Sequence, residues 1–319
     1  MNKKLLSVIL SSAIVAGALL GCSGKSVSSD SKKMTVGALE SVNTMQPFFY
    51  DEFSDESENL EVNTFEGYDE MKDAVISGKL DIAATNWISA IKAAENGEDI
   101  KVIAGMSNGE SALVVKKDSG IENIEDLKGK TIGYFPESIE YVKLANELKE
   151  KGIDIKKDVK FKEMDFESMT KELSGGNIDA FCGEEPYVSI ALEDGFGKVI
   201  DYKSDEIVPL NTAIIATEEN IKDDPEKMRE LMDKHVKSTN HFMMSKEDRI
   251  NKAAEFGIDK KYLEKSIDNI ELSTDISPEM IEEVKKLAEE MKEIGMIDNI
   301  PNIENMFDLS MLENSMMKR

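Results

Sequence analysis

Polar and aromatic side chains interrupt the apolar segments of this chain at four places. They are "LESVNTMQPFF" from residue 39, "ATNWISA" from 84, "YFPESIEY" from 134 and "CGEEPY" from 182, each after a run typical of a β-strand. Their carboxylates, amides and hydroxyls suit hydrogen bonding to a small polar ligand, and their aromatic rings suit stacking. In open α/β sheets, ligands lie beyond the carboxyl ends of strands, near helix N-termini. The four stretches therefore predict a ligand-binding site.

The candidate ligand-binding residues come from these stretches. They are Glu40, Asn43, Asn86, Trp87, Ser138, Glu185 and Tyr187, with Gln46, Thr85 and Glu184 in the same stretches. Trp87, the only tryptophan, is equally compatible with a core position. Glu185 is also compatible with a simple helix start before Pro186, since carboxylates suit a helix N-terminus.

Motifs that would indicate metal or nucleotide binding are absent from the sequence. It has no HExxH, CxxC or Walker motif, and "GYFPES" lacks the glycines of a phosphate-binding loop. His235 and His241 are six residues apart on one predicted helix, about 240° around its axis, so they do not share a face for a metal. We therefore expect no catalytic residue, no metal and no cofactor.

The elements that must position the candidate residues follow an alternating order. Strand-like runs alternate with helical patterns from residue 34 to 116, and the same order restarts from 117 to 208. Such alternation is typical of α/β sheets with parallel strands, so we predict two α/β lobes. A strand near 210–216 follows. Beyond it every pattern is helical, including a helix that starts at "SPEM" with Ser277 as N-cap, and the segment after 298 suits short helices.

The N-terminus has the pattern of a secretory signal. Lys3 and Lys4 precede a short apolar run, and the run ends at "LLGC", residues 19–22. "LLGC" resembles the bacterial lipobox, in which the cysteine becomes the lipidated first residue of the mature protein. The resemblance implies a signal peptide at 1–21, lipidation of Cys22 and a Ser- and Lys-rich flexible tether at 22–33. An uncleaved signal anchor is the alternative. Cys182 would then be the only other thiol, and a packed strand position suits it better than a ligand contact.

The charge of the chain restricts its partners. The formal net charge is −25 and hydrophobic residues make up 40% of the chain. Nucleic acid is excluded as a partner because nothing here would neutralise its phosphates. We expect contact with the membrane only at the N-terminus.

Three passages resemble one family. "KLDIAATNW", "KDSGIENIEDLKGKTIGYF" and "NIDAFCGEEPY" occur in the order and spacing seen in type II periplasmic binding proteins of ABC importers. The closest group is the nitrate/sulfonate/taurine and thiamine-precursor binding family, and the resemblance covers about residues 34–245. This chain departs from the family after the first strand, where "YDEFSDESENL" replaces a glycine-rich passage.

The resemblance implies a two-lobed α/β type II periplasmic-binding-protein fold with a hinge and C-terminal helices. Lobe one would contain residues 34–116 and 209–319, and lobe two residues 117–208. The hinge would lie near Lys116–Ser119 and Glu206–Pro209. The implied function is that of an extracytoplasmic, lipid-anchored, monomeric binding protein. It would capture a small molecule between the lobes and deliver it to an ABC permease and an ATPase on separate chains.

The ligand class follows from the acidic candidates. Glutamates in the cleft argue against a bare anion, because a carboxylate beside an anionic ligand costs several kcal/mol. We expect a neutral or amine-bearing nitrogen heterocycle, such as a thiamine precursor, with Trp87 or Tyr187 stacking on it. A sulfonate- or nitrate-type solute is the second possibility. A ligand sensor, and an enzyme on the same scaffold resembling the pyrimidine-precursor synthases, are the alternative functions.

Overall fold

The computed structural model describes residues 33–55, 59–109, 111–200 and 211–316, all within one compact unit of residues 32–319. The predicted signal peptide, Cys22 and the crossover Glu206–Pro209 lie outside the described residues. Within the described part of the chain, no helix is both long and apolar enough to cross a membrane.

The first sheet contains six strands among the described residues, in the order β11-β4-β10-β3-β1-β2. They are β1 (Met34–Ala38), β2 (Leu60–Thr64), β3 (Ile82–Asn86), β4 (Lys101–Gly109), β10 (Thr212–Ala216) and β11 (Ile270–Leu272). β1 pairs in parallel with β2 and β3, whereas β10 runs antiparallel between β3 and β4. β3 and β10 are buried along their whole length, so "IAATN" and "TAIIA" show no alternation of polar and apolar residues.

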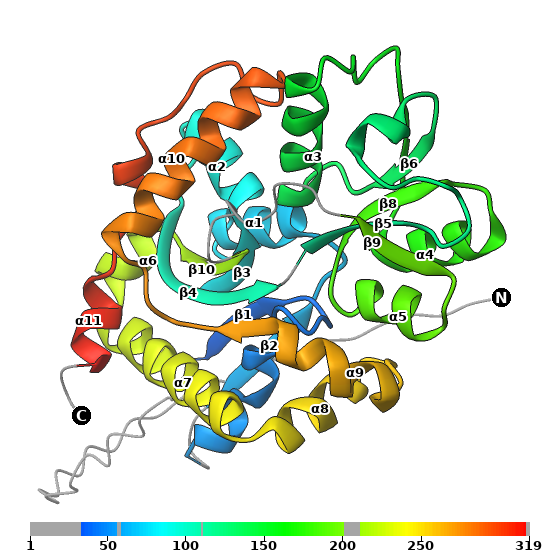
Figure 1. Ribbon diagram of the computed structural model, residues 1–319. Coiled ribbons are helices and arrows are strands. Elements are labelled where there is room, and N and C mark those ends of the chain that lie inside the picture. Colours follow the sequence, from blue (N-terminus) through cyan, green and yellow to red (C-terminus); the bar gives the residue numbers. More distant parts are fainter. Residues whose placement is uncertain (1–32, 56–58, 110, 201–210, 317–319) are drawn as a thin grey trace, which may run out of the picture. The chain divides into compact units, whose positions relative to one another are not determined.

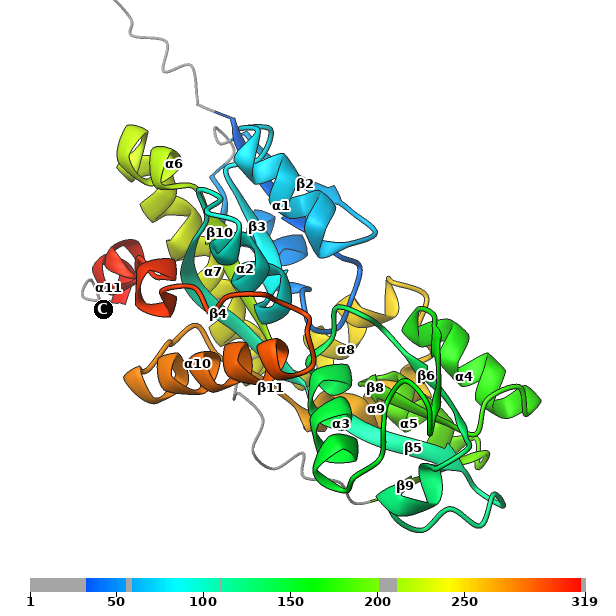
Figure 2. The same ribbon diagram turned by 90° about the horizontal axis from the view of Figure 1, so that it is seen from above.

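The second sheet contains five described strands in the order β7-β6-β8-β5-β9. They are β5 (Ser111–Lys116), β6 (Thr131–Tyr134), β7 (Lys160–Glu163), β8 (Ala180–Glu184) and β9 (Gly197–Ile200). β6 is parallel to β7 and β8, while β5 is antiparallel to β8 and β9. The two sheets form separate groups in Figures 1 and 2. The predicted two-lobed α/β fold is therefore confirmed.

The crossover between the sheets differs from the prediction. β4 in the first sheet ends at Gly109 and β5 in the second sheet begins at Ser111, so the change of sheet comes before Ser111 rather than near Lys116–Ser119. The strand 111–116 therefore belongs with lobe two. Its continuous apolar sequence, "SALVVK", predicts a buried strand but does not specify the sheet, which is decided by its pairing with β8 and β9.

Helices cover both sheets. Those of the first sheet and the C-terminal half are α1 (Tyr68–Ile76), α2 (Trp87–Glu95), α6 (Glu218–Asp223), α7 (Pro225–Met244), α8 (Lys246–Ala254), α9 (Lys260–Ser266), α10 (Pro278–Glu293) and α11 (Ser310–Met316), with the 3₁₀ helices η1 (Gln46–Phe53), η4 (Ile267–Asn269) and η5 (Ile303–Met306). Those of the second sheet are α3 (Ile139–Glu150), α4 (Phe166–Gly175), α5 (Tyr187–Glu193) and η2 (Ile124–Leu127). Side-chain caps fix several starts: Ser138, Asp165 and the predicted Ser277 each accept a hydrogen bond from a backbone N–H of the first turn.

The helix α3 packs into two hydrophobic cores. Ile139 and Val142 belong to the core of the first sheet, whereas Leu144 and Leu148 belong to the core of the second. An ion pair also links α3 to α10, which packs on the first sheet: Lys143 Nζ lies 3.0 Å from Glu290 Oε1. This helix, which carries candidate residues at its start, is therefore positioned by both lobes.

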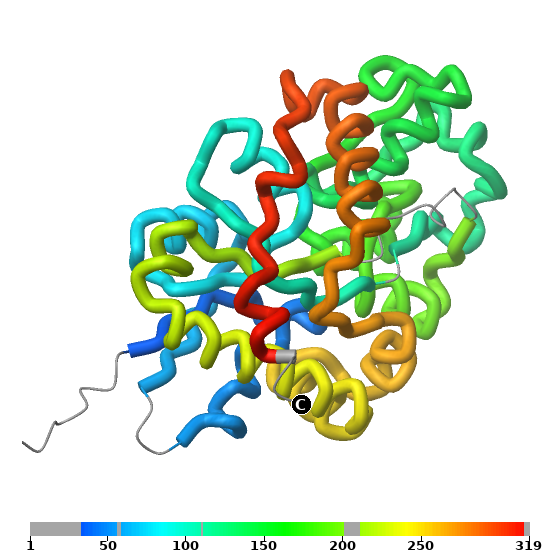
Figure 3. Tube along the Cα trace, turned by 90° about the vertical axis from the view of Figure 1, so that its left-hand side faces the viewer, coloured from blue at the N-terminus to red at the C-terminus, as the bar shows by residue number. Residues whose placement is uncertain are grey.

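The C-terminal third is not wholly helical. β11 adds an edge strand to β4, which the purely helical pattern after residue 216 did not predict, because three residues are too few to show a periodicity. The tail forms the short helices η5 and α11, as predicted for the segment after 298. Figure 3 shows this tail running beside α10, and η5 contacts both α10 and β4.

Candidate functional site

A pocket of about 380 Å³ lies between elements of the two sheets. Small-molecule sites typically measure ~300–1,000 Å³, so the pocket suits a small ligand. Its lining comes from the segments that follow β1, β2, β3, β6, β7 and β8, together with the start of β10. Because β10 runs antiparallel, its start lies at the same edge as the carboxyl ends of its neighbours. This is the position that ligands take in open α/β sheets.

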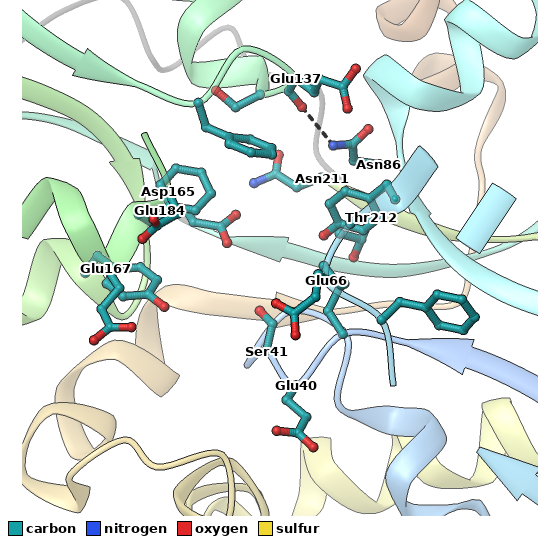
Figure 4. Close-up of a pocket in the computed structure, with 18 of the residues that line it drawn as sticks. Glu40, Ser41, Glu66, Asn86, Glu137, Asp165, Glu167, Glu184, Asn211 and Thr212 are labelled. Carbon is teal, nitrogen blue, oxygen red and sulfur yellow. Dashed lines mark hydrogen bonds between the residues drawn. The ribbon is translucent and has the colours of Figure 1, made fainter. Parts of the chain in front are cut away.

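Carboxylates dominate the lining. They are Glu40, Glu66, Glu137, Glu140, Asp165, Glu167 and Glu184, and the described lining includes no Lys, Arg or His. Figure 4 shows Asp165, Glu167 and Glu184 on one side of the pocket and Glu40 and Glu66 on the other. Only two of the seven carry an ion pair within the described chain, Glu137 with Lys92 at 2.7 Å and Glu167 with Lys171 at 2.6 Å. The pocket is therefore a region of strong negative potential.

Glu184 and Glu140 occupy the inner end of the pocket. Glu184, the last residue of β8, is the register partner of Ser111, and the Ser111 hydroxyl donates a 2.5 Å hydrogen bond to Glu140. Both carboxyl groups thus lie over the same end of the β5–β8 pair. Burial, and next the negative charge of Glu140, raise the pKa of Glu184 to about 8. Both causes favour the protonated carboxyl group of Glu184 over its carboxylate.

Two buried asparagines lie beside these carboxyl groups. Asn211 lines the pocket; its Nδ2 donates to the Gly109 carbonyl at 3.0 Å, whereas its Oδ1 has no partner among the described residues. Asn43 lies behind the lining, where its amide favours the ionised form of Glu184 although the geometry falls short of a hydrogen bond. A Cβ atom at Gly109 would lie 3.0 Å from Asn43 Oδ1, so this position favours glycine.

An aromatic wall faces the acidic groups. Phe166 and Tyr187 stack with ring centroids 5.9 Å apart and an interplanar angle of 21°, and Phe135 lies 5.5 Å from Phe166. Burial, with Glu184 as the next cause, raises the pKa of Tyr187 to about 12, so its phenol stays protonated. Aromatic faces beside carboxylates suit a flat or positively charged ligand.

Four of the predicted residues lie in the pocket. Glu40, Asn86, Ser138 and Tyr187 are in its lining. Glu40 is exposed and, in Figure 4, points away from Glu184. Asn86 caps α2 through its Oδ1, which accepts from Ser89 N at 2.8 Å. Its Nδ2 donates to the Glu137 carbonyl, also at 2.8 Å, and so joins elements of the two sheets.

Three of the predicted residues lie outside the lining. Trp87 is fully buried and packs against Phe307, with ring centroids 5.9 Å apart, so its predicted stacking role is corrected to a core position. Asn43 is also fully buried, one layer behind the pocket wall.

Glu185 has a structural position instead of the predicted ligand contact. Its carboxylate accepts hydrogen bonds from Ser189 N, Ser189 Oγ and Asn269 Nδ2 at 2.7–3.0 Å. It therefore fixes the start of α5 and ties this start to η4. The adjacent Glu184 reaches the pocket because neighbouring residues at the end of a strand point to opposite sides.

Several lining residues were not selected from the sequence. Glu140, Asp165, Phe135, Phe166 and Asn211 are the main ones. Asp165 and Glu140 lie at helix starts after strands, the same signal that selected Ser138, and this signal would have found them. Asn211 lies at the start of the strand predicted near 210–216, and the sequence does not show that this strand runs antiparallel and so brings its start to the pocket.

Titratable groups outside the pocket have structural partners. His235 is fully buried, with Nδ1 2.8 Å from the Tyr50 hydroxyl and Nε2 2.7 Å from the Gly105 carbonyl. Cys182 is buried as expected, and its thiol donates to the Glu140 carbonyl at 3.4 Å. No group of three or more His, Cys, Asp or Glu residues suited to a metal ion occurs in the described part of the chain.

Comparisons with known proteins identify the family and the fold of the chain. The sequence profile described as NMT1/THI5 like matches residues 53–250, more than half of the chain. The search of curated proteins with this chain found no match.

Solved structures share the fold. The aliphatic sulphonate binding protein SsuA of Escherichia coli superposes with a TM-score of 0.75 at 17% identity, covering 86% of this chain and 97% of that one. The ligand-binding component of an ABC-type import system from Staphylococcus aureus gives 0.73 at 19% identity, with coverages of 88% and 98%. The nitrate-binding protein NrtA of Synechocystis gives 0.71 at 11% identity, with coverages of 91% and 89%.

Proposed function

The chain belongs to the NMT1/THI5-like family, and from this premise we propose that it is the substrate-binding component of an ABC importer. Its pocket captures a small nitrogen-containing molecule, such as a thiamine precursor or a related heterocycle. The observation that carries the proposal is the lining of seven carboxylates and an aromatic wall, with no basic side chain among the described lining residues.

The lining favours a nitrogen compound over the anions that related proteins bind. A sulfonate or nitrate would lie against carboxylates with no cation to neutralise it, at a cost of several kcal/mol. Ring nitrogens and amino groups instead donate hydrogen bonds to carboxylates, while Phe166 and Tyr187 offer a flat surface for the ring. The pocket volume of about 380 Å³ also suits a one- or two-ring molecule.

Binding without catalysis fits the chemistry of the pocket. Its hydroxyls include Ser138, which caps α3, and Thr212, which donates to the Asn43 carbonyl at 3.1 Å. Activation of the Ser–His type requires an imidazole beside the hydroxyl, and the described lining contains no histidine.

The position in the cell follows from the N-terminal sequence. Cleavage before Cys22 and lipidation of its sulfur would hold the protein at the outer face of the membrane, where the tether lets it reach a permease. A single acyl chain binds membranes weakly, so stable retention requires the several chains that lipoproteins carry. Mass spectrometry of the membrane-bound protein tests this: a lipid-modified N-terminal Cys22 supports the anchor, and an intact residue 1 contradicts it.

Thermal denaturation with a panel of compounds tests the ligand class. A soluble form beginning at Ser23 is heated with aminopyrimidines, thiamine, riboflavin, amino acids, taurine, alkanesulfonates, bicarbonate and nitrate. A ligand present at a thousand times its Kd stabilises a protein by about 4 kcal/mol, which is readily seen. We expect stabilisation by nitrogen heterocycles.

A matched pair of variants shows whether a ligand found in this way occupies the pocket. Tyr187→Leu removes a pocket ring and should abolish the stabilisation. Tyr262→Leu removes a tyrosine that bonds Asp194 on the surface, and it should leave the stabilisation intact. Stabilisation by sulfonates or nitrate alone would contradict the proposed ligand class. The absence of stabilisation by any compound of the panel would count against the binding function itself.

A further inference from the structure

Hydrogen-bond acceptors gather at the inner end of the pocket, and no basic side chain lies among the described lining residues there. Two carboxyl groups, Glu184 and Glu140, lie beside two amides that are at least nine-tenths buried. The Asn211 Oδ1 has no hydrogen-bond partner among the described residues, and neither does the Asn43 side chain. Figure 4 shows the Asn211 amide pointing into the pocket on the side of Glu184. Buried polar atoms without a hydrogen-bond partner are uncommon in native structures, and that of Asn211, a lining residue, leaves acceptor capacity beside the two carboxyl groups.

We propose that this inner end binds a positively charged nitrogen of the ligand and that Glu184 releases a proton to solvent as the ligand enters. This inference rests on the proposed function and narrows it. The ligand is a cation, either a permanent one or a protonated amine or ring nitrogen, rather than a neutral base.

The charged and titratable groups around Glu184 are acidic on every side. Glu140 faces it from α3, Tyr68 from α1 and Tyr187 from α5. Along its own chain lie the Cys182 thiol and Glu185, which is bonded to Ser189 and Asn269. Asp165 and Glu167 lie beyond Tyr187 on the α4 side.

Burial keeps the neighbouring phenols and thiol protonated. It raises the pKa of Tyr68 and the pKa of Cys182 well above their usual values. Glu184 remains as the source of the proton.

The proton and the cation compete for the same charge. In the empty pocket a proton reduces the repulsion between the two carboxyl groups. A cationic nitrogen neutralises that charge instead, so the proton leaves. Affinity for a cation should then rise with pH, by up to about tenfold per pH unit below pH 8, and level off above it.

Isothermal titration of the full chain in a non-ionic detergent tests both parts of the inference. The probes are two matched pairs: 1-methylpyridinium with pyridine, and choline with 3,3-dimethylbutan-1-ol. At pH 8 each pair differs chiefly in charge. A pH indicator in weakly buffered phosphate, which contains no amine, reports the protons released per ligand bound. We expect at least tenfold tighter binding of a cation than of its neutral partner, with up to one proton released at pH 7.

Two variants identify the source of the proton. Glu184→Gln should abolish proton release and flatten the pH dependence. Glu172→Gln removes one negative charge from the same lobe, where Glu172 pairs with Lys162 outside the pocket, and should preserve both effects. Carbon-13 NMR of the Glu184 carboxyl, assigned by its loss in Glu184→Gln, gives a readout without any ligand. We expect this carboxyl group to take up a proton near neutral pH. Titration near pH 4.5 would overturn the proposed release of a proton on cation binding.

The binding results separate the two proposals. Equal or tighter binding of the neutral partners would overturn the inference, as would cation binding without proton release. Failure of every cation to bind, while heterocycles without charge or anions bind, would also overturn it but leave a solute-binding function intact. The absence of binding by cations, neutral compounds and anions alike would contradict both.

Discussion

The side-chain amide of Asn86 donates a 2.8 Å hydrogen bond to the backbone carbonyl of Glu137. Asn86 ends β3 of the first sheet, and Glu137 follows β6 of the second. Glu137 also forms an ion pair with Lys92 of α2, whose Nζ lies 2.7 Å from the Glu137 carboxylate. Asn86 and Glu137 both line the pocket, so these contacts join the two lobes beside it and stabilise the arrangement in which both lobes reach a ligand.

Loss of the Lys92 ion pair should weaken ligand binding modestly. Lys92→Met removes the pair without replacing a lining residue, and partly exposed pairs contribute about 0.2–1 kcal/mol. We expect the Kd of an uncharged ligand to rise about twofold to fivefold, whereas for a cation the charge freed on Glu137 offsets part of this loss. Lys149→Met removes the exposed pair with Glu293 and is the control. Equal effects of both substitutions would show that the contact beside the pocket has no special role.

Replacement of Glu184 should stabilise the unliganded protein at high pH. Folding raises the pKa of Glu184 to about 8, so the folded state binds more protons than the unfolded state between about pH 4.5 and 8. Stability falls as the pH rises through that window. Glu184→Gln cannot ionise, and it should raise the free energy of unfolding by roughly 1–3 kcal/mol at pH 8 and hardly at all at pH 4.5. Urea denaturation at the two pH values measures the difference.

Replacement of the neighbouring Glu185 should have the opposite sign. Its carboxylate accepts three hydrogen bonds, from Ser189 and Asn269, and is almost wholly buried. Glu185→Ala leaves these donors unpaired, at a cost of about 1–3 kcal/mol. The melting temperature at pH 7 should fall for Glu185→Ala and should not fall for Glu184→Gln. A fall of similar size in both would contradict the different environments assigned to the two residues.

Acid should destabilise the protein through His235. Burial lowers the pKa of His235 to about 4, so between about pH 6.5 and 4 the unfolded state binds the extra proton. Stability is therefore lost as the pH falls through that window. His235→Gln should lower stability at pH 7, because it disturbs the contact with the Tyr50 hydroxyl, but it should reduce the loss between pH 6.5 and 4.5. His241→Gln, on the same helix, is the control for removal of an imidazole.

Trp87 should matter for stability and not for affinity. Its ring is fully buried against Phe307, and truncation of a buried tryptophan typically costs about 3–5 kcal/mol. Trp87→Phe is the milder variant if Trp87→Ala fails to fold. The Kd of the Trp87→Phe variant for the ligand should equal that of the wild type within twofold. A large loss of affinity with unchanged stability would restore the stacking role that the sequence predicted for Trp87.

The fold could be predicted largely from local patterns, and the pocket only in part. β3, β6 and β8 are short apolar runs that stop at polar residues, so their ends, and hence Asn86 and Ser138, could be located. The choice between Glu184 and Glu185 depends on where β8 ends, and a shift of one residue exchanges their directions.

Other features depend on contacts between distant residues. Trp87 is buried by Phe307, which lies more than 200 positions along the chain. β5 joins the second sheet only through its partners β8 and β9. Asn211 reaches the pocket because β10 inserts between β3 and β4. No local periodicity carries this information.

The double packing of α3 has a consequence for how ligand preference diversifies. Ile139 is embedded in the core of the first sheet, and the next residue along the chain, Glu140, forms part of the acidic inner end of the pocket. A change of side-chain volume around Ile139 would therefore displace Glu140 without altering any residue that touches the ligand. Mutational drift in an apolar core can in this way retune selectivity, and homologues with identical pocket residues need not share a ligand.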